Sequence, residues 1–419
     1  MGYVDTSYKP RADDILVEFY VESNHCSLRE AAEAIAAESS IGTWTDVSTM
    51  NARIRALGAK VYSIKKNGII KIAYPIELFE KGNISQLMSS VAGNIFGMKC
   101  VKNLRLLDIH FPYSYLMYFK GPRLGKDGIR KMMKIYGRPL LGTIVKPKLG
   151  LSAKEHANVA TNAWLGGLDI VKDDENLTSM RFNNFEERIL KTLDALDYAQ
   201  DIAGEQKAYM PNVTAQYDEM LKRAEYAIDH GSKYVMVDII SCGWSGVQQL
   251  CEDLKERVAI HAHRAGHAAF TKNPKHGISM LVIAKLARLV GVDQIHIGTV
   301  NIGKMVQTDD EQVMEDEIED KIITNDDKKH ILAQRWFHIK PTLAVASGGL
   351  HPGMIPELIE KMGNDVVLQF GGGCHGHPNG TLVGAMAIRE AMNAVTSGIK
   401  LNDYAKYHSA LKDALKKWK

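Results

Sequence analysis

Short apolar runs alternate with longer helix-like segments from about residue 138 onward, and this alternation restricts the possible folds more than any other feature of the chain. There are eight such runs, each bounded by turn residues and followed by a segment with helical spacing. Eight strand–helix units over roughly 280 residues have the size of a (β/α)8 barrel, and an open, doubly wound sheet of eight strands is the competing arrangement. The expected strands are PLLGTIVK, LDIVK, AYMPNV, YVMVDI, VAIHAH, QIHIG, TLAVA and VVLQF.

The preceding segment has an irregular mixture of strand and helix patterns. Strand-like runs occur at residues 14–22, 60–64, 69–75 and 104–112. Ser27 and Glu30 form a capping box that opens a helix, and a second helix is expected near residues 84–92. The stretch GPRLGKDGI then indicates a link between domains. The sequence therefore predicts an α/β chain with a smaller α+β, ferredoxin-like N-terminal domain at residues 1–125 and a C-terminal TIM-barrel catalytic domain at residues 126–419.

Composition and charge limit the partners of this chain. Of its 419 residues, 45% are hydrophobic and 24% are charged, which is typical of a globular protein. The net charge of +3 includes no block of like charges, so neither nucleic acid nor a membrane surface is indicated. The five cysteines have no CxxC spacing, no run of 18 apolar residues occurs, and the N-terminus lacks the apolar core of a signal peptide. We therefore expect a cytoplasmic protein with no nucleic-acid or membrane partner.

Ionisable residues and glycines gather at the C-terminal ends of the expected strands, where barrel enzymes place their chemistry. Because side chains alternate along a strand, Lys172 shares a face with Asp174, and His261 shares one with His263. This recurrence in register predicts a single site at one end of the barrel. The residues are Lys146, Lys148, Lys172 to Glu175, Asn212, Asp238, His261 to Arg264, His296, Ser347 to Gly349 and Gly371 to Gly373.

The KDDE segment at residues 172–175 is the most informative of these clusters. Carboxylates at a strand end are hard oxygen ligands of the kind that Mg²⁺ takes. A cationic Lys172 would oppose metal binding, whereas a carbamate formed from Lys172 and CO₂ would be a third anionic ligand beside Asp174 and Glu175. The alternative is that Lys172 only forms a salt bridge with these acids.

The glycine runs after the seventh and eighth strands are placed where TIM barrels commonly hold phosphate. Together with Lys146, Arg264, His296 and Lys304, they suit a substrate with two phosphates. The loop at residues 298–304 has glycines near both ends and a terminal lysine, as a lid over an anionic substrate needs, although an ordinary solvated loop has the same composition. A dinucleotide site at GGGCHG and zinc sites at the two His-x-His pairs are weaker alternatives, and hydrogen-bonding histidines are favoured over zinc ligands.

Six barrel motifs, in order and with matching spacing, resemble the active-site motifs of the ribulose-1,5-bisphosphate carboxylase/oxygenase large chain. They are GTIVKPKLGLS, GGLDIVKDDEN, HAHRAGHAAF, DQIHIGTV, VASGGLHPG and LQFGGGCHGHP. AAESSIGTWTDV at residues 36–47 and VAGNIFGMK at residues 91–99 extend the resemblance to the N-terminal domain. The resemblance thus covers nearly the whole chain and implies addition of CO₂ and water to ribulose 1,5-bisphosphate, giving two 3-phosphoglycerate, with an oxygenase side reaction.

The resemblance also implies roles for single residues. Lys172 would be carbamylated by CO₂ and would bind Mg²⁺ with Asp174 and Glu175, Lys146 would exchange protons with the substrate, and Lys304 would close over CO₂. The implied catalytic residues are Lys146, Lys172, His263 and Lys304. The implied substrate-binding residues are Glu38, Thr43, Trp44, Asn94, Lys148, Arg264, His296, Ser347, Gly348, Gly349, Gln369, Gly371 and Gly372.

The resemblance implies a shared active site as well. Glu38, Thr43, Trp44 and Asn94 would reach the barrel of a neighbouring subunit, so a homodimer with two-fold symmetry, alone or in an assembly of dimers, would be the smallest active unit. The chain length and the wording ESSIGTWT resemble the archaeal-type branch, which is associated with nucleoside monophosphate salvage. The loop GTVNIGK is one residue longer than the usual GTVVGK, which affects expectations about closure over CO₂.

Three other functions compete with carboxylation. A related enolase or isomerase could act on a phosphorylated ketone in methionine salvage, although such relatives usually lose several of the lysines that are present here. A Schiff-base aldolase would need a lysine whose pKa is lowered by desolvation, and the acids next to Lys172 argue against it. A catalytically silent binding protein would leave the strand-end residues unexplained.

Overall fold

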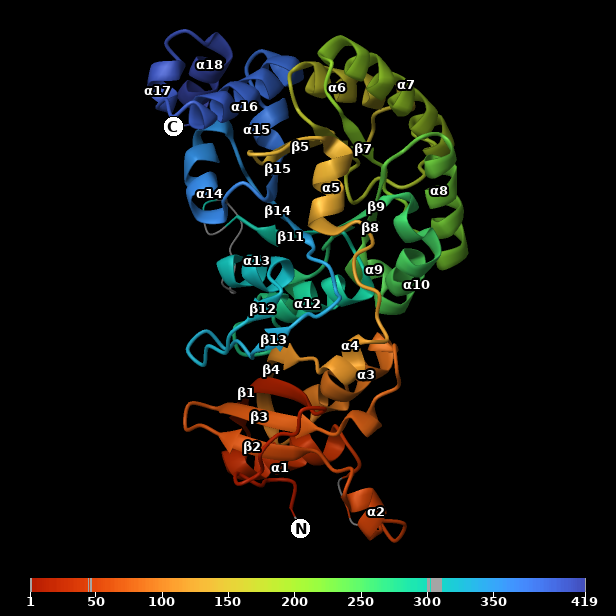
Figure 1. The fold of residues 1–419 in the computed structure, drawn as a ribbon, viewed down its shortest axis with the longest axis vertical. Coiled ribbons are helices and arrows are strands. Elements are labelled where there is room, and N and C mark those ends of the chain that lie inside the picture. The colour runs from red at the N-terminus through yellow and green to blue at the C-terminus, as the bar shows by residue number, and fades with distance from the viewer. Residues whose placement is uncertain (1, 44, 46, 300–301, 303–310, 419) are drawn as a thin grey trace.

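The computed structural model describes residues 2–43, 45, 47–299, 302 and 311–418, and it is elongated, with a small sheet domain at one end and a barrel at the other (Figure 1). The small domain contains β1 (Ile15–Ser23), α1 (Leu28–Glu38), α2 (Ala52–Arg55), β2 (Lys60–Ile64), β3 (Ile69–Tyr74), α3 (Ile84–Val91), the 3-10 helix η2 (Asn94–Gly97), β4 (Val101–His110) and α4 (Tyr113–Leu116).

The N-terminal sheet has the predicted ferredoxin-like arrangement. Its strands lie in the order β4-β1-β3-β2 with antiparallel neighbours, and apart from the four-residue helix α2 the chain order from β1 to β4 is βαββαβ. Helix α1 begins at the predicted capping box, in which Glu30 N donates to Ser27 Oγ over 3.2 Å and Ser27 N donates to Glu30 Oε2 over 2.8 Å. The short strand β10 (Gly277–Ile278), which the sequence analysis did not predict, adds to this sheet in parallel beside β4.

All eight predicted barrel strands are present and parallel. They are β5 (Leu140–Ile144), β6 (Ile170–Lys172), β7 (Ala208–Met210), β8 (Tyr234–Asp238), β9 (Ala259–His263), β11 (Gln294–Gly298), β14 (Leu343–Ser347) and β15 (Val366–Phe370). The sheet order runs from β7 through β6, β5, β15, β14, β11 and β9 to β8. Asn212 and Met236 bridge the two end strands, where Val213 N donates to Met236 O over 2.9 Å. The sheet is therefore closed into a barrel, and the open-sheet alternative is wrong.

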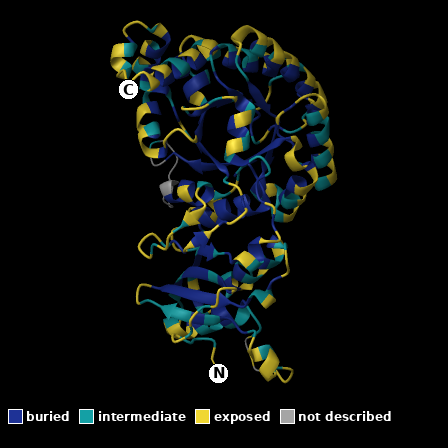
Figure 2. Ribbon diagram, viewed as in Figure 1, coloured by how far each residue is buried: buried dark blue, intermediate teal, exposed yellow. Residues whose placement is uncertain are grey.

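Helices surround the barrel strands (Figure 1). They are α6 (Ala153–Leu165), α7 (Phe185–Ala203), α8 (Tyr217–Asp229), α9 (Ile239–Cys242), α10 (Trp244–Leu254), α11 (Ala268–Thr271), α12 (Met280–Val290), α13 (Glu311–Glu319), α14 (Ile355–Met362), α15 (Gly372–His375), α16 (Gly380–Thr396), α17 (Leu401–Tyr404) and α18 (Ser409–Lys417). The strands and the inner faces of these helices are buried, and exposed residues concentrate on the outer faces of the helices (Figure 2). None of the described helices combines the length and apolarity needed to cross a membrane.

Helix α5 (Gly125–Met133) closes the end of the barrel at which the strands begin. Its Ile129 and Met133 are buried against the first residues of the strands, including Leu140, Ile170 and Leu343. Helix α5 covers this end, so a site that is open to a substrate must lie toward the C-terminal ends of the strands. The fold therefore directs the predicted site to that mouth.

Candidate active site

Lys172, the last residue of β6, has a buried side chain that is 1% exposed. Its amine donates to the Asp173 carbonyl oxygen over 2.8 Å and contacts Met236 Sδ at 3.2 Å, and it makes no ion pair with any other residue that the structure describes. Burial lowers the pKa of Lys172 below its ordinary value, although Glu175 and Asp174 act in the opposite direction. The salt-bridge interpretation of Lys172 is therefore not what the structure shows, and burial shifts the amine toward its neutral form.

The lysine that does pair with the acidic cluster is Lys146, two residues beyond β5. Its Nζ lies 2.5 Å from Asp174 Oδ2, and Asn176 Nδ2 donates to the other carboxylate oxygen, Oδ1, over 3.0 Å. Burial acts to raise the pKa of Asp174, but the hydrogen bond and charge of Lys146 outweigh it and the net pKa is lowered. The ionised Asp174 carboxylate and the half-buried Glu175 beside it thus place two acids at the mouth of the barrel.

Histidines from β9 and β11 continue the site around the barrel. His263 Nδ1 lies 2.8 Å from Asp238 Oδ1, and His263 Nε2 lies 3.7 Å from Glu175 Oε2. His296 Nδ1 lies 2.6 Å from Ser347 Oγ at the end of β14, and the centroids of the His263 and His296 rings are 4.9 Å apart. Burial, followed by neighbouring imidazoles, lowers the pKa of His296 well below its ordinary value, so its imidazole is neutral.

The glycine loops after β14 and β15 touch one another. Gly348 and Gly349 have φ values of 126° and 79°, a left-handed backbone that favours glycine. A Cβ atom on Gly373 would lie 2.0 Å from the Leu350 carbonyl oxygen, so only glycine permits this approach. The two predicted phosphate-binding loops thus lie against each other at the mouth.

Gln369 and Gly371 link these loops to the first strand. Gln369 is 1% exposed, its amide lies over Gly142, and neither Nε2 nor Oε1 has a hydrogen-bond partner among the described residues. A Cβ atom on Gly371 would lie 3.7 Å from Lys146 Cε, whereas a Cβ on Gly372 would have open space around it. The loop after β15 therefore borders the same space as Lys146.

Two further predicted residues sit at the rim. Lys148 is exposed in the loop that follows β5, and Arg264 is buried directly after β9. The structure therefore brings the predicted barrel residues among those it describes to one end of the barrel.

The N-terminal residues of the prediction do not join this mouth within one chain. Glu38 ends α1, Thr43 is exposed just after it, and Asn94 begins η2, which packs with α1, α3 and β4. Helix α1 lies at the end of the molecule away from the barrel (Figure 1). Trp44 and Lys304 lie outside the described residues, so nothing is said of their positions.

The second His-x-His pair is engaged in structural hydrogen bonds. His375 Nε2 lies 2.8 Å from the Ile144 carbonyl oxygen, and its Nδ1 lies 3.0 Å from Thr381 Oγ1. His377 Nε2 lies 3.1 Å from the Ala410 carbonyl oxygen. These contacts agree with the interpretation that these histidines form hydrogen bonds in the barrel scaffold.

Sequence reasoning missed two residues that shape the site, Met236 and Asn176. Met236 lies two residues before Asp238 on β8, so strand alternation already placed it on the face of that acid. Asn176 donates to Asp174 Oδ1 from both its backbone N and its side-chain Nδ2. An aspartate whose side chain accepts from the backbone two residues later forms an Asx turn, and the sequence Asp-Glu-Asn could have indicated this turn.

Comparisons with known proteins agree with this geometry over the whole chain. Residues 126–418 match the ribulose bisphosphate carboxylase large chain, catalytic domain, and residues 2–115 match the N-terminal domain of the same family. The ribulose bisphosphate carboxylase of Methanocaldococcus jannaschii is 50% identical with 100% of both chains covered, and that of Pyrococcus furiosus is 50% identical over 100% of this chain and 97% of its own.

Solved structures give the same result. The dimeric archaeal Rubisco from Hyperthermus butylicus has a TM-score of 0.94 at 44% identity, covering 99% of this chain and 98% of its own. The octameric Rubisco from Pyrococcus horikoshii, in complex with sulfate ion, has a TM-score of 0.91 at 48% identity, covering 99% and 96%. The chain therefore belongs to the ribulose bisphosphate carboxylase large-chain family, in its archaeal-type branch, and is a carboxylase of that family.

Proposed function

We propose that the chain adds CO₂ and water to ribulose 1,5-bisphosphate at a Mg²⁺ site that is completed by a carbamate on Lys172. The observation that carries this proposal is the state of Lys172, a buried amine that contacts a carbonyl oxygen and a sulfur instead of a carboxylate. A neutral amine is the nucleophile that carbamate formation needs, and burial shifts Lys172 toward that form by lowering its pKa.

The residues present fit the metal. Asp174 and Glu175 would hold it together with the Lys172 carbamate, which makes a set of three anionic oxygen ligands of the type Mg²⁺ prefers, with open positions for substrate oxygens. When bound, Mg²⁺ stabilises the negative charge that develops on the enediolate oxygens of the substrate.

The surrounding side chains would move protons and orient the substrate. Lys146, which is 34% exposed at the mouth beside Asp174, is placed to exchange a proton with the reacting carbons, and exposed Lys148 stands in the same loop. The Asp238 carboxylate favours a proton on His263 Nδ1, which leaves Nε2 to face Glu175 and the reaction space.

The two phosphates would lie on opposite sides of the mouth. Arg264, His296 and Ser347 would bind one end of the substrate, and the backbone of the glycine loops would bind the other. The residues proposed for the glycine-loop side are Gly348, Gly349, Gln369, Gly371 and Gly372. Lys304 and Trp44, which lie outside the described residues, remain part of the proposal through the resemblance.

The proposal includes a dimer as the active unit. Relatives of this fold are described as dimeric and octameric, and Glu38, Thr43 and Asn94 lie on a domain that does not reach the barrel mouth of its own chain. We infer that they complete the site of a neighbouring subunit. An oxygenase side reaction, a role in nucleoside monophosphate salvage and a cytoplasmic location belong to the same proposal.

Fixation of labelled CO₂ into 3-phosphoglycerate, with purified protein, Mg²⁺, bicarbonate and ribulose 1,5-bisphosphate, tests the reaction. Lys172→Ala is the inactive control, and its melting profile shows whether it is folded. Product from the wild type alone supports the carboxylase and the role of Lys172. Folded wild type that exchanges the substrate C3 proton without fixing CO₂ would favour the enolase alternative instead.

A further inference from the structure

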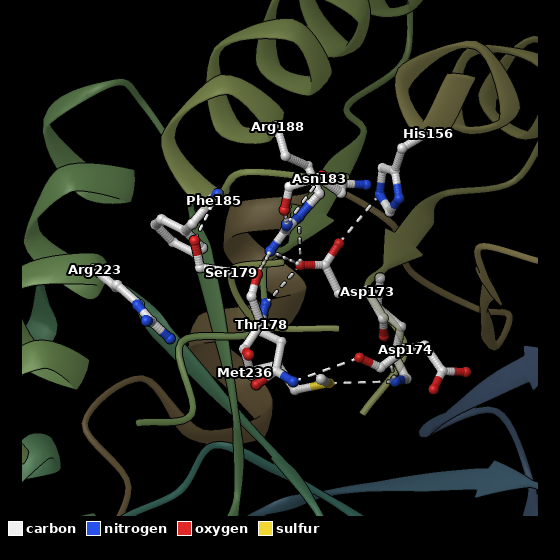
Figure 3. Close-up of polar contacts among 12 residues, drawn as sticks. His156, Asp173, Asp174, Thr178, Ser179, Asn183, Phe185, Arg188, Arg223 and Met236 are labelled. Atoms are coloured by element: carbon white, nitrogen blue, oxygen red, sulfur yellow. Dashed lines mark hydrogen bonds and ion pairs between the residues drawn. The ribbon is translucent and has the colours of Figure 1, made fainter. Parts of the chain in front are cut away.

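Asp173 is the acid of the KDDE segment that the proposed chemistry does not use. Strand alternation separates it from its neighbours, because Lys172 and Asp174 face the mouth while Asp173 points outward, toward the helices. Its carboxylate is fully buried and lies between His156 of α6 and Arg188 of α7 (Figure 3). It accepts hydrogen bonds from Arg188 Nε at 3.1 Å and from Tyr209 OH at 2.6 Å, and His156 Nε2 lies 3.1 Å away.

Arg188 of α7 extends this contact across the loop that follows β6. Its Nη2 donates to the Thr178 carbonyl oxygen over 2.6 Å, and its Nη1 donates to Asn183 Oδ1 over 3.1 Å (Figure 3). One planar guanidinium therefore holds the start of the loop at Asp173, its middle at Thr178 and its end at Asn183. A lysine could replace the charge but not this fork of donors.

The loop that Arg188 holds, residues 173–183, also carries the two proposed metal ligands, Asp174 and Glu175. Asp173 N donates to the Met210 carbonyl oxygen of β7 over 3.1 Å, and Asn212 Nδ2 donates to the Glu175 carbonyl oxygen over 3.0 Å, so the backbone on either side of Asp174 is fixed to β7 and the residues that follow it. Asn212 N also donates to Asp173 Oδ2 over 2.9 Å. Ligand carboxylates bind a metal well only when outer contacts hold them in one geometry, and loss of such contacts typically lowers metal affinity by about 10- to 100-fold.

We propose that Arg188, acting through Asp173, is a positioning residue that sets the geometry of the metal ligands Asp174 and Glu175. The inference rests on the proposed function for the identity of the ligands. The competing role is purely structural, in which Arg188 stabilises the fold and the metal site follows only because the fold does.

Arg130 serves as a control that distinguishes positioning of the metal ligands from stabilisation of the fold. Arg130 of α5 is also buried, and it bonds the carbonyl oxygens of Arg138 and Asn364 and pairs with Asp365, but it lies at the closed end of the barrel. Arg188→Lys and Arg130→Lys therefore remove the same kind of donor fork at opposite ends of the same barrel.

The experiment measures Mn²⁺ binding to the folded protein in the presence of bicarbonate, together with the Mg²⁺ concentration for half-maximal activation. We expect Arg188→Lys to weaken metal binding about 10-fold or more, with a less than twofold change in the KM for ribulose 1,5-bisphosphate at saturating Mg²⁺. Arg130→Lys should lower the melting temperature by a comparable amount and leave metal binding within twofold. Equal metal affinity in the two variants would overturn the inference.

Tyr209→Phe keeps the test decisive if Arg188→Lys does not fold. It removes one hydrogen bond from Asp173 and leaves no buried charge without its partner, so it should weaken Mn²⁺ binding in the same direction by a smaller factor. Unchanged affinity in this variant would also overturn the inference. Wild-type protein that binds Mn²⁺ but fixes no CO₂ would refute the proposed function alone, since the variants are compared by binding.

Discussion

Two buried lysines, one at the barrel mouth and one at the junction of the two domains, have opposite electrostatic environments. Lys285 of α12 is 0% exposed, and its Nζ lies 2.8 Å from Asp108 Oδ1 on β4 and 3.4 Å from Glu317 Oε1 on α13. Burial acts to lower the pKa of Lys285, but the two carboxylates outweigh it and the net pKa is raised. Lys172 is equally removed from water, lacks such a contact among the described residues, and has a lowered pKa.

The difference shows that burial alone does not make a lysine reactive. Both sites remove water from the amine, and the presence or absence of a carboxylate in direct contact then decides whether the proton stays. At the junction the charge is kept, and it ties the N-terminal sheet to two barrel helices. At the mouth the contacts are a carbonyl oxygen and a thioether, which do not hold a proton on the amine as an ionised acid does.

The largest expected effect is the loss of activity in Lys172→Met. The variant cannot form a carbamate, so we expect carboxylation to fall by about three orders of magnitude or more, equivalent to about 4 kcal/mol of transition-state stabilisation. Because an amine without an ion pair is replaced by an apolar side chain of similar length, stability should be unchanged or higher. Urea unfolding and labelled CO₂ fixation measure both quantities, and a large loss of stability would contradict the description of this site.

Substitution of Lys285 by methionine should lower stability and leave activity unchanged, the reverse of the result expected for Lys172→Met. Lys285→Met leaves Asp108 and Glu317 as buried carboxylates without their cation, which should lower the free energy of unfolding by about 3–5 kcal/mol. The turnover rate of the folded variant should stay within twofold of the wild type. A loss of stability below about 1 kcal/mol in urea unfolding would mean that the junction does not depend on the charge of Lys285.

A carboxylate placed beside Lys172 should raise the pKa of this lysine, as Asp108 and Glu317 raise the pKa of Lys285. Met236→Glu brings a carboxylate to the position of the sulfur that lies 3.2 Å from Lys172 Nζ. An opposite charge at this range raises a lysine pKa by about one to three units, so CO₂-dependent activation at a fixed pH should slow by about tenfold or more. Met236→Gln has the same shape without the charge and is the matched control. Equal activation rates in the two variants would refute the electrostatic explanation.

Much of the fold and of the site could be predicted because both depend on local patterns. The eight strands follow from apolar runs with turn residues between them, and Asp174, His263 and Ser347 follow from polar residues at strand ends. In a barrel, every strand end leads to the same mouth, so the sequence position alone brings these side chains together.

The parts that could not be predicted depend on contacts between distant segments. Lys285 and Asp108 are separated by 177 positions, and β10 joins a sheet whose other strands precede it by more than a hundred residues. No periodicity in either segment indicates its partner. The outward role of Asp173 was also missed, because the sequence analysis assigned Asp174 and Glu175 to the metal and gave Asp173 no role of its own, since its partners Arg188 and Tyr209 follow it by 15 and 36 positions.

The smallest predicted effect concerns the pH dependence of the junction. Burial, with the nearby charge of Asp108, raises the pKa of Glu317 to about 7, while Lys285 opposes the shift. Because this folded-state pKa exceeds the unfolded value of about 4.5, the contribution of Glu317 to stability is fully present below about pH 4.5 and is lost as the pH rises through about 7. The wild type should therefore lose on the order of 1–3 kcal/mol across this window relative to Glu317→Gln, which has no proton to release. Urea unfolding at a series of pH values measures the difference, with the exposed Glu360→Gln as control, and parallel stability curves for the wild type and Glu317→Gln would show that the junction holds Glu317 ionised throughout.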